Sequence, residues 1–256
     1  IEPKYDYVGY FNEGLVEVKL NGKLGFVDSI GEIIIPIKYD DVNAFSMGIA
    51  QVKLNNKWGF IDKMGESTIE IKYEEIGDFT CEVQFFKISP ARLNGKVGFI
   101  DKTGKVVVPF LYDDAEMVCT LFYGLAKVKM NGKYGFIDET GKEVIPLIFK
   151  NLEPFYSELA AAKLSNKWGF INRQGEEVIS MKYDEVGFSN RELICVQLNS
   201  KYGFINRKGE EVIPLIYDGA DMNDFSSDIA KVQLNDKWGF INEQGKEVIQ
   251  LIYDYL

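Results

Sequence analysis

A unit built around a Gly-Phe pair occurs seven times in tandem, and this repetition limits the possible folds more than any other feature. A second glycine follows six residues after the first in every copy, and an aromatic residue follows eight positions later. Repetition at a nearly fixed period indicates an array of similar structural modules. The pairs begin at Gly25, Gly59, Gly98, Gly135, Gly169, Gly203 and Gly239.

Each unit predicts three β-strands. In the fourth copy, residues 125–130 alternate small or apolar side chains with lysine, which is typical of a half-buried strand. An Asn-Gly pair follows and favours a type I′ hairpin turn into a second strand at 133–138. An Asp-x-x-Gly turn then leads to a third strand at 143–149. Proline interrupts this third strand in four copies, so we expect it at a sheet edge.

Both faces of the predicted sheet carry apolar side chains. A two-residue turn places Lys129 opposite Tyr134 and Val128 opposite Gly135. The expected register puts Ala126, Val128, Ile137, Ile145, Leu147 and Phe149 on one face, and Tyr134, Phe136, Val144, Pro146 and Ile148 on the other. A sheet with one face in water would not need two apolar faces, so each sheet is expected to be sandwiched between its neighbours.

The predicted fold is therefore all-β, with seven tandem three-stranded antiparallel repeats in a propeller-like array. Both ends of the chain carry the third strand, so they overlap instead of completing each other, and an open superhelix is favoured over a closed ring. We expect a single repeat-array domain over residues 1–256, in which residues 1–8 are the tail of a preceding repeat. The repeats are expected at residues 9–41, 42–75, 76–114, 115–151, 152–185, 186–219 and 220–256.

Composition narrows the classes of function. The net charge of −10 argues against nucleic acid as a partner, and no apolar run is long enough to span a membrane. Residues 1–6 match residues 35–40, so we expect the native N-terminus to lie upstream, and the compartment, cytoplasmic or exported, stays open. The absence of histidine excludes Ser-His-Asp and Cys-His catalysis and histidine metal sites. We expect no enzymatic activity, no cofactor and no metal.

Acidic residues follow the closing aromatic of most copies, as in Asp40-Asp41 and Glu74-Glu75, and a lysine precedes the central Gly-Phe segment in all seven. These charges could line a cation site or bind a basic partner. Turn capping and ion pairs between modules are the favoured interpretation, because the fourth copy has Lys150-Asn151 at the acidic position. A hydrolytic site built from Asp113, Asp114 and Glu116 is a third, less favoured hypothesis.

Aromatic residues supply the candidate binding sites. Trp58, Trp168 and Trp238 occupy the position before the central glycine, with Lys53, Lys163 and Gln233 as the expected cross-strand neighbours. They could stack on sugars or a peptide, or could fill the seam between modules. Two longer connectors break the repeat and add a second set of candidates, which are Phe85, Phe86, Phe122 and Tyr123. Phenylalanine recurs six residues after the closing aromatic, at Phe11, Phe45, Phe79 and Phe155, and these connector residues are expected to plug the seams.

The Lys-Trp-Gly-Phe-Ile segments at residues 57–61, 167–171 and 237–241 resemble the signature of the bacterial WG-repeat family, also called KWG repeats. The Asn-Gly turn that precedes the equivalent segment in other copies matches as well, as does the Asp-x-x-Gly or Asn-x-x-Gly turn that follows it. The resemblance implies β-rich tandem repeats and transfers no catalytic residues. We therefore expect a non-catalytic repeat scaffold that binds a protein or peptide. The alternative is a carbohydrate-binding module with tryptophan and tyrosine platforms and a polysaccharide ligand.

Overall fold

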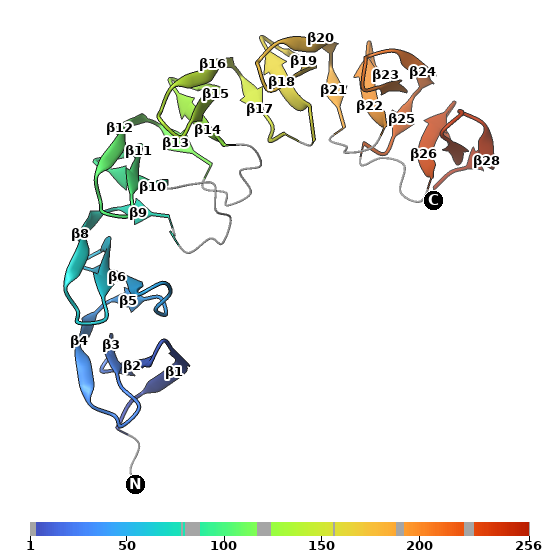
Figure 1. The fold of residues 1–256 in the computed structure, drawn as a ribbon. Coiled ribbons are helices and arrows are strands. Elements are labelled where there is room, and N and C mark those ends of the chain that lie inside the picture. Colours follow the sequence, from blue (N-terminus) through green and yellow to red (C-terminus); the bar gives the residue numbers. More distant parts are fainter. Residues whose placement is uncertain are drawn as a thin grey trace. The chain divides into compact units, whose positions relative to one another are not determined.

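The structure, a computed structural model, describes residues 4–77, 79, 88–116, 124–155, 157–187, 192–222 and 228–255. All helical or extended secondary structure described in these ranges is β-strand. The strands form seven four-stranded sheets that follow one another along the chain (Figure 1). The prediction of an all-β fold of seven tandem repeats is confirmed. Two compact units divide the chain, Ile1–Asn131 with Ile137–Lys142 and Gly132–Phe136 with Glu143–Leu256. The predicted open superhelix depends on how the two units are arranged, so it remains a prediction.

The strands fall into four sets by their place in the sheet. The first hairpin strands are β2 (Leu15–Leu20), β6 (Ile49–Leu54), β10 (Ile88–Leu93), β14 (Leu125–Met130), β18 (Ala160–Leu164), β22 (Leu193–Leu198) and β26 (Ile229–Leu234). The second are β3 (Lys23–Val27), β7 (Lys57–Asp62), β11 (Lys96–Asp101), β15 (Lys133–Asp138), β19 (Lys167–Ile171), β23 (Lys201–Asn206) and β27 (Lys237–Asn242). The third are β4 (Ile33–Tyr39), β8 (Ser67–Tyr73), β12 (Val106–Tyr112), β16 (Glu143–Phe149), β20 (Glu177–Tyr183), β24 (Glu211–Tyr217) and β28 (Glu247–Tyr253). The fourth set comprises β1 (Tyr7–Asn12), β5 (Asp41–Val42), β9 (Glu75–Ile76), β13 (Asp114–Ala115), β17 (Asn151–Leu152), β21 (Glu185–Val186) and β25 (Gly219–Ala220).

The fourth set corrects the expectation of three strands per repeat. In six sheets this added strand is only two residues long, so its sequence is too short to show an alternating pattern. It pairs with the first hairpin strand of the next sheet, as in Asp41 opposite Lys53 and Val42 opposite Val52. A single residue, Asp40, separates β4 from β5. The chain therefore passes from the edge of one sheet directly to the edge of the next.

The turns confirm the predicted hairpins. Asn131 and Gly132 both have positive φ, 52° and 74°, as a type I′ turn requires. In the second turn, the backbone N–H of Gly65 donates to the carbonyl oxygen of Asp62 at 3.0 Å. The Asp62 carboxylate also accepts hydrogen bonds from the N–H groups of Met64 and Glu66, each at 2.9 Å. The third strand then forms one edge of every sheet, where its prolines were expected.

The third strand corrects part of the predicted side-chain arrangement. In the first sheet Ile35 lies opposite Phe26, and Tyr39 lies opposite Leu24, with β-bulges between the pairs. These residues correspond to Ile145 and Phe149, which the even alternation had placed on the face of Ala126. An extra residue at a bulge shifts the alternation and moves side chains to the other face. The aromatic that closes each repeat, which is buried in the first six repeats, therefore belongs to the face of Phe26 and its equivalents.

The hydrophobic cores lie between consecutive sheets. One core joins Phe26, Ile35 and Tyr39 of the first sheet to Val52 and Ile61 of the second. Another joins Phe204, Ile213 and Tyr217 of the sixth sheet to Val232 and Ile241 of the seventh. These contacts confirm, within each unit, that a sheet uses both faces and depends on its neighbours.

Connector phenylalanines complete two of these cores as predicted, but the prediction was wrong for Phe11, which lies in the exposed edge strand β1 and is itself 58% exposed. The Phe45 ring contacts Phe26 edge to face, with 4.8 Å between centroids. Phe79 contacts Phe60 in the same way, with 5.3 Å between centroids. Cys195 in β22 is fully buried. The other two cysteines, Cys81 and Cys119, lie outside the described residues.

Candidate functional site

The acidic residue after the closing aromatic joins neighbouring sheets. The backbone N–H of Asp40 donates to the carbonyl oxygen of Lys53 at 2.8 Å, which fixes Asp40 at the crossing from β4 to β5. Its carboxylate accepts a hydrogen bond from Lys23 at the start of β3. The backbone N–H groups of Asn55 and Asn56, in the hairpin turn of the next sheet, donate to it as well. We call this set of lysine, acid and turn N–H a carboxylate clamp.

The clamp recurs with the same spacing in both units. The lysine pairs with an acid seventeen residues later, as in Lys57 with Glu74 at 3.2 Å and Lys96 with Asp113 at 2.5 Å. Three further pairs are Lys167–Asp184, Lys201–Asp218 and Lys237–Asp254. The turn N–H groups of Gly95, Asn131, Asn199 and Asn235 donate to the carboxylates of Glu74, Asp113, Asp184 and Asp218 at 2.7–2.9 Å.

The clamps lower the pKa of their carboxyl groups. A hydrogen bond from Lys23 holds the pKa of Asp40 below its ordinary value, and Lys167 and Lys201 do the same for Asp184 and Asp218. For Glu74 the N–H of Gly95 is the main cause of the lower pKa, followed by Lys57. These groups are accessible to solvent, so water screens the ion pairs. Their main effect is to fix how the turn of one sheet meets the edge of its neighbour.

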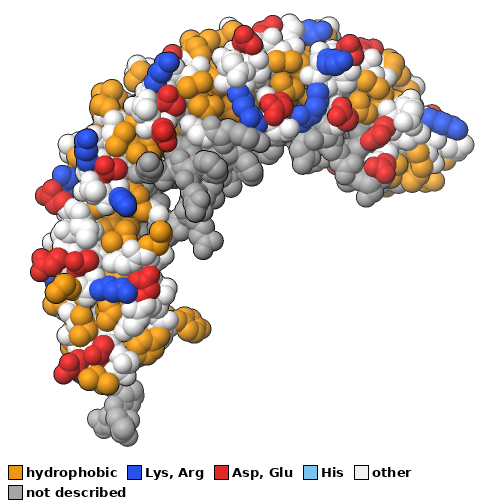
Figure 2. Space-filling model, in the orientation of Figure 1, with side chains coloured by type: hydrophobic (Ala, Val, Ile, Leu, Met, Phe, Trp, Pro, Cys, Tyr) orange, Lys and Arg blue, Asp and Glu red, His pale blue; other side chains and the backbone are white. Residues whose placement is uncertain are grey.

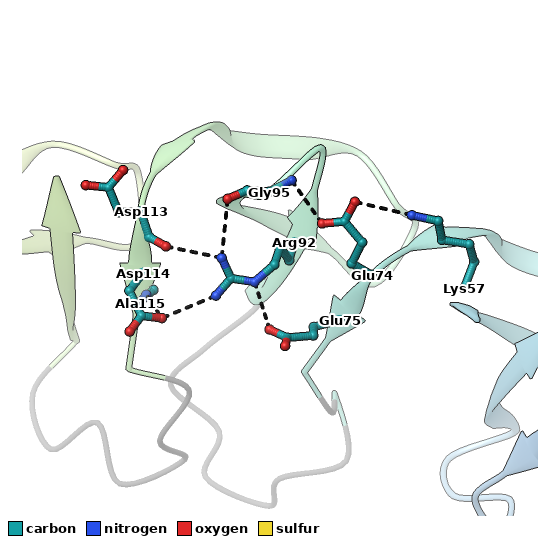
Figure 3. A network of polar contacts seen from close by, with 8 residues as sticks. All are labelled: Lys57, Glu74, Glu75, Arg92, Gly95, Asp113, Asp114 and Ala115. Atoms are coloured by element: carbon teal, nitrogen blue, oxygen red, sulfur yellow. Dashed lines mark hydrogen bonds and ion pairs between the residues drawn. The ribbon is translucent and has the colours of Figure 1, made fainter. Parts of the chain in front are cut away.

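A larger polar network surrounds Arg92 in β10 (Figure 3). The Arg92 guanidinium donates to the Glu75 carboxylate at 2.9 Å and to the carbonyl oxygen of Asp113 at 3.1 Å. It also reaches Asp114 at 3.4 Å, so one side chain links β9, β10 and β13. The planar fork of arginine can serve several oxygens at once, which a single ammonium group cannot do.

The three acids of the hydrolytic hypothesis, Asp113, Asp114 and Glu116, all have basic partners in the structure. Asp113 is held by Lys96 and by the N–H of Asn131, and Asp114 is paired with Arg92. Glu116 pairs with Lys127 at 3.0 Å. Across the described residues, no group of three or more acidic or cysteine side chains is placed to hold a metal ion. The acids that the sequence singled out thus serve contacts between strands.

The three tryptophans occupy equivalent places in three different sheets. The cross-strand neighbours are those predicted, Lys53 for Trp58 and Lys163 for Trp168, and each lysine Nζ lies 5.3 Å from the indole centroid. Trp238 lies opposite Gln233, and Lys231 lies over its ring at 4.6 Å. All three indoles are half-buried. Each of these three sheets thus provides an aromatic platform that is covered in part by a lysine.

The other predicted binding residues, Phe85, Phe86, Phe122 and Tyr123, lie outside the described residues, and their role stays a prediction. The sequence interpretation missed a different surface on the third strands. Ile148, Ile216 and Ile252 are 46%, 47% and 57% exposed, although each precedes the closing aromatic of its repeat. Valines at the start of the same strands are also exposed, at Val178, Val212 and Val248. We call these six residues the outer-strand row; the alternation of Val, Pro and Ile in β24 would have indicated it.

The strands, sandwiched cores and clamps define an all-β tandem-repeat protein whose recurring side chains serve contacts between modules. The chain belongs to the WG containing repeat family, whose sequence profile matches nearly its whole length. The matched segments are residues 1–23, 25–58, 58–96, 98–134, 134–168, 168–202, 202–238 and 238–256. The resemblance predicted from the Lys-Trp-Gly-Phe-Ile segments is therefore confirmed.

No curated protein matches the chain. A eukaryotic initiation factor structure is similar at 10% identity over 93% of this chain and 73% of that one, with a TM-score of 0.44. AztD from Citrobacter koseri is 8% identical over 94% of this chain and 81% of its own, with a TM-score of 0.40. PorZ from Porphyromonas gingivalis is 11% identical, with a TM-score of 0.33, and this chain spans 38% of it. Similarity at this level says nothing about function.

Proposed function

We propose that the chain is a non-catalytic repeat scaffold that binds a protein or peptide partner through the outer-strand row. The supporting observation is that Ile148, Ile216 and Ile252 project into solvent at the same position of three third strands, two of which also bury apolar residues such as Ile145 and Ile213. Exposed apolar groups are also visible between charged side chains in the space-filling view (Figure 2). Apolar side chains repeated at one strand position offer a binding surface that a single exposed residue does not.

The outer strands favour recognition by side chains over addition of a partner strand. Pro146 and Pro214 lie in β16 and β24 and lack the N–H that a pairing strand would need. Val212, Pro214 and Ile216 all point outward from β24, because strand side chains alternate. The partner is therefore expected to bury these side chains in an apolar face of its own.

The contacts of the acidic side chains support the proposal of a non-catalytic role. The carboxylates that follow the closing aromatics pair with lysines and with turn N–H groups, and so are engaged in holding sheets together. No helix among the described residues has the length and apolar character to cross a membrane. A protein or peptide is the partner class that an apolar row on a rigid repeat surface fits best.

A capture experiment tests the proposal. The full chain, the triple variant Ile148→Thr/Ile216→Thr/Ile252→Thr and the control Lys182→Thr are immobilised, and the proteins bound from a lysate are quantified by mass spectrometry. Threonine keeps the β-branched shape and removes apolar surface. Lys182 occupies the equivalent place in β20 and is naturally polar, so its substitution should retain capture. The expected result is a set of proteins held by the parent and the control and lost by the triple variant. Equal capture by all three chains contradicts the proposal.

Carbohydrate binding through the tryptophans is the second candidate, favoured by one observation, that Trp58, Trp168 and Trp238 are only partly buried. A glycan array probed with the full chain and with Trp58→Ala tests it. Binding of a polysaccharide that the variant loses would favour this function over the first. Binding to no glycan would remove it.

A further inference from the structure

The junction between the fourth and fifth sheets lacks the acid of a carboxylate clamp. Lys150 stands where the other junctions have Asp40, Glu74, Asp113, Asp184 and Asp218. Its backbone is held in the same way, because its N–H donates to the carbonyl oxygen of Lys163 at 2.8 Å. The N–H of Asp184 donates to Gln197 at the same distance. The Lys150 side chain therefore starts from the place that a carboxylate takes elsewhere.

Both donors of the clamp are nevertheless present. Lys133 begins β15 as Lys167 begins β19, and Ser165 opens the next hairpin turn. Ser165 has φ of 56°, close to the 52° of Asn131 and Asn199, whose N–H groups donate to clamp carboxylates. Within the part of the chain that the structure describes, neither Lys133 nor Lys150 pairs with an acid, and the Ser165 N–H has no acceptor.

The charge around this junction is also reversed. At the three preceding junctions the added strand brings an acid opposite a basic residue, as in Asp41 opposite Lys53, Glu75 opposite Arg92 and Asp114 opposite Lys129. Here Asn151 lies opposite Lys163, and its amide donates to Glu153 at 3.2 Å. The junction thus has Lys133, Lys150 and Lys163 at its clamp and cross-strand positions and no acid there, in a chain whose net charge is −10.

We propose that this junction binds a carboxylate group of a partner protein, supplied by an aspartate or glutamate side chain. At four other junctions one carboxylate accepts hydrogen bonds from the equivalent lysine and from the N–H of the next turn. The equivalent donors at this junction are Lys133 and Ser165, and Lys150 adds a second ammonium group. Charge-assisted hydrogen bonds from an ammonium and a backbone N–H are the contacts that bind carboxylates most strongly. The site rests on the proposed function, since it names one chemical feature of the partner.

An NMR titration tests the site. The full chain, labelled with nitrogen-15, is titrated with a tetraglutamate peptide blocked at both ends, with a blocked tetraglutamine peptide, and with inorganic phosphate. We expect a saturable shift of the Ser165 amide signal with tetraglutamate and none with tetraglutamine. No Ser165 response to tetraglutamate overturns the proposal. A phosphate response as strong as that of the peptide overturns the assignment to carboxylate and leaves a general anion site.

Two matched variants separate the site from overall charge. Lys150→Asp restores the acid of the other junctions, so it should close the clamp within the chain, raise the melting temperature and weaken tetraglutamate binding at least about tenfold. Lys102→Asp makes the same charge change at an exposed turn residue and should leave binding within about twofold of the parent. Equal losses in the two variants overturn the site in favour of a general charge effect.

The two proposals fail separately. Capture of a partner that depends on the outer-strand row, without a Ser165 response, refutes the carboxylate site alone. A Ser165 response that Lys150→Asp removes, in a chain that captures no partner through the outer-strand row, refutes the proposed function alone.

Discussion

The carbonyl oxygen of Ile145 lies 2.5 Å from the point where a Cβ atom on Gly135 would stand. The same close approach recurs at the central glycine of every repeat, with Ile35 over Gly25 at 2.6 Å and Ile213 over Gly203 at 2.7 Å. The obstacle is the backbone of the bulged third strand of the same sheet. A side chain at this place would therefore push the edge strand away from the hairpin.

Gly135→Ala is expected to destabilise the chain by about 1–3 kcal/mol, because the strand backbone cannot move aside as a flexible side chain would. Valine should cost more. The control is Gly132→Asn in the adjacent turn, where Asn56 already occupies the equivalent position with φ of 61°. Thermal unfolding followed by circular dichroism measures both variants. A melting temperature for Gly135→Ala equal to that of the control would contradict the close approach.

Ile35 and Ile34 are neighbours with opposite environments. Ile35 is fully buried in the core between the first and second sheets, whereas Ile34 is 40% exposed. Ile35→Ala should cost about 2–5 kcal/mol, the usual range for a large-to-small change in a core, and Ile34→Ala well under half of that. Urea unfolding of the two variants compares them directly. Similar losses would show that the first two sheets do not share a core.

The clamps predict how stability changes in acid. The pKa values of Asp184 and Asp218 lie below the ordinary 3.8 because of their lysine hydrogen bonds, and the pKa of Glu74 lies below 4.5 because of Gly95 and Lys57. A carboxyl group with a lowered folded-state pKa contributes stability that is present above the unfolded-state value and disappears as pH falls through the folded-state value. The melting temperature should therefore decline as pH drops below these ordinary values.

Asp184→Asn tests how much one clamp contributes to the fall of the melting temperature in acid. It should lower the melting temperature at neutral pH and reduce the further fall on acidification, because one of the titrating groups is gone. Asp236→Asn, at an exposed turn position with φ of 62°, is the control and should follow the parent at every pH. If Asp184→Asn and the parent lose the same number of degrees between pH 7 and the acid limit, the clamp does not contribute as described.

The sequence allowed the strands to be predicted, because turn chemistry and alternation are local properties. The bounds 125–130, 133–138 and 143–149 agree with β14, β15 and β16, and the pairing of Lys53 with Trp58 followed from a two-residue turn. The favoured interpretation of the acids as capping and pairing groups also agrees with the clamps. The face assigned to Ile145 was wrong, because a bulge in the pairing depends on hydrogen bonds to the neighbouring strand and not on the residue types alone.

The two-residue strands could not be predicted for a different reason. Asp41 and Val42 become a strand only because the next sheet offers β6 as a partner, which is a tertiary contact. Ile148 and Ile145 are both apolar residues of one strand, yet the first is exposed and the second fully buried. Alternation separates the two residues, but which face is buried depends on the bulged pairing with the second strand. Lys150 was noticed as a break in an acidic pattern, but its meaning depended on seeing what the other acids bind.

Lys53 over Trp58 gives the last prediction. The Lys53 Nζ lies 5.3 Å from the indole centroid, and Trp58 packs against the core of the second and third sheets. Lys53→Met keeps the apolar stem and removes the charge, so it should cost about 0.5–1 kcal/mol from the lost cation–π attraction. Lys102→Met, at an exposed turn residue, is the control for the change in net charge and should cost less. Urea unfolding compares the two. If Lys53→Met is as stable as the parent, the ammonium group does not stabilise the fold through the ring. Lys53 then only covers Trp58, and a ligand could displace it without loss of stability.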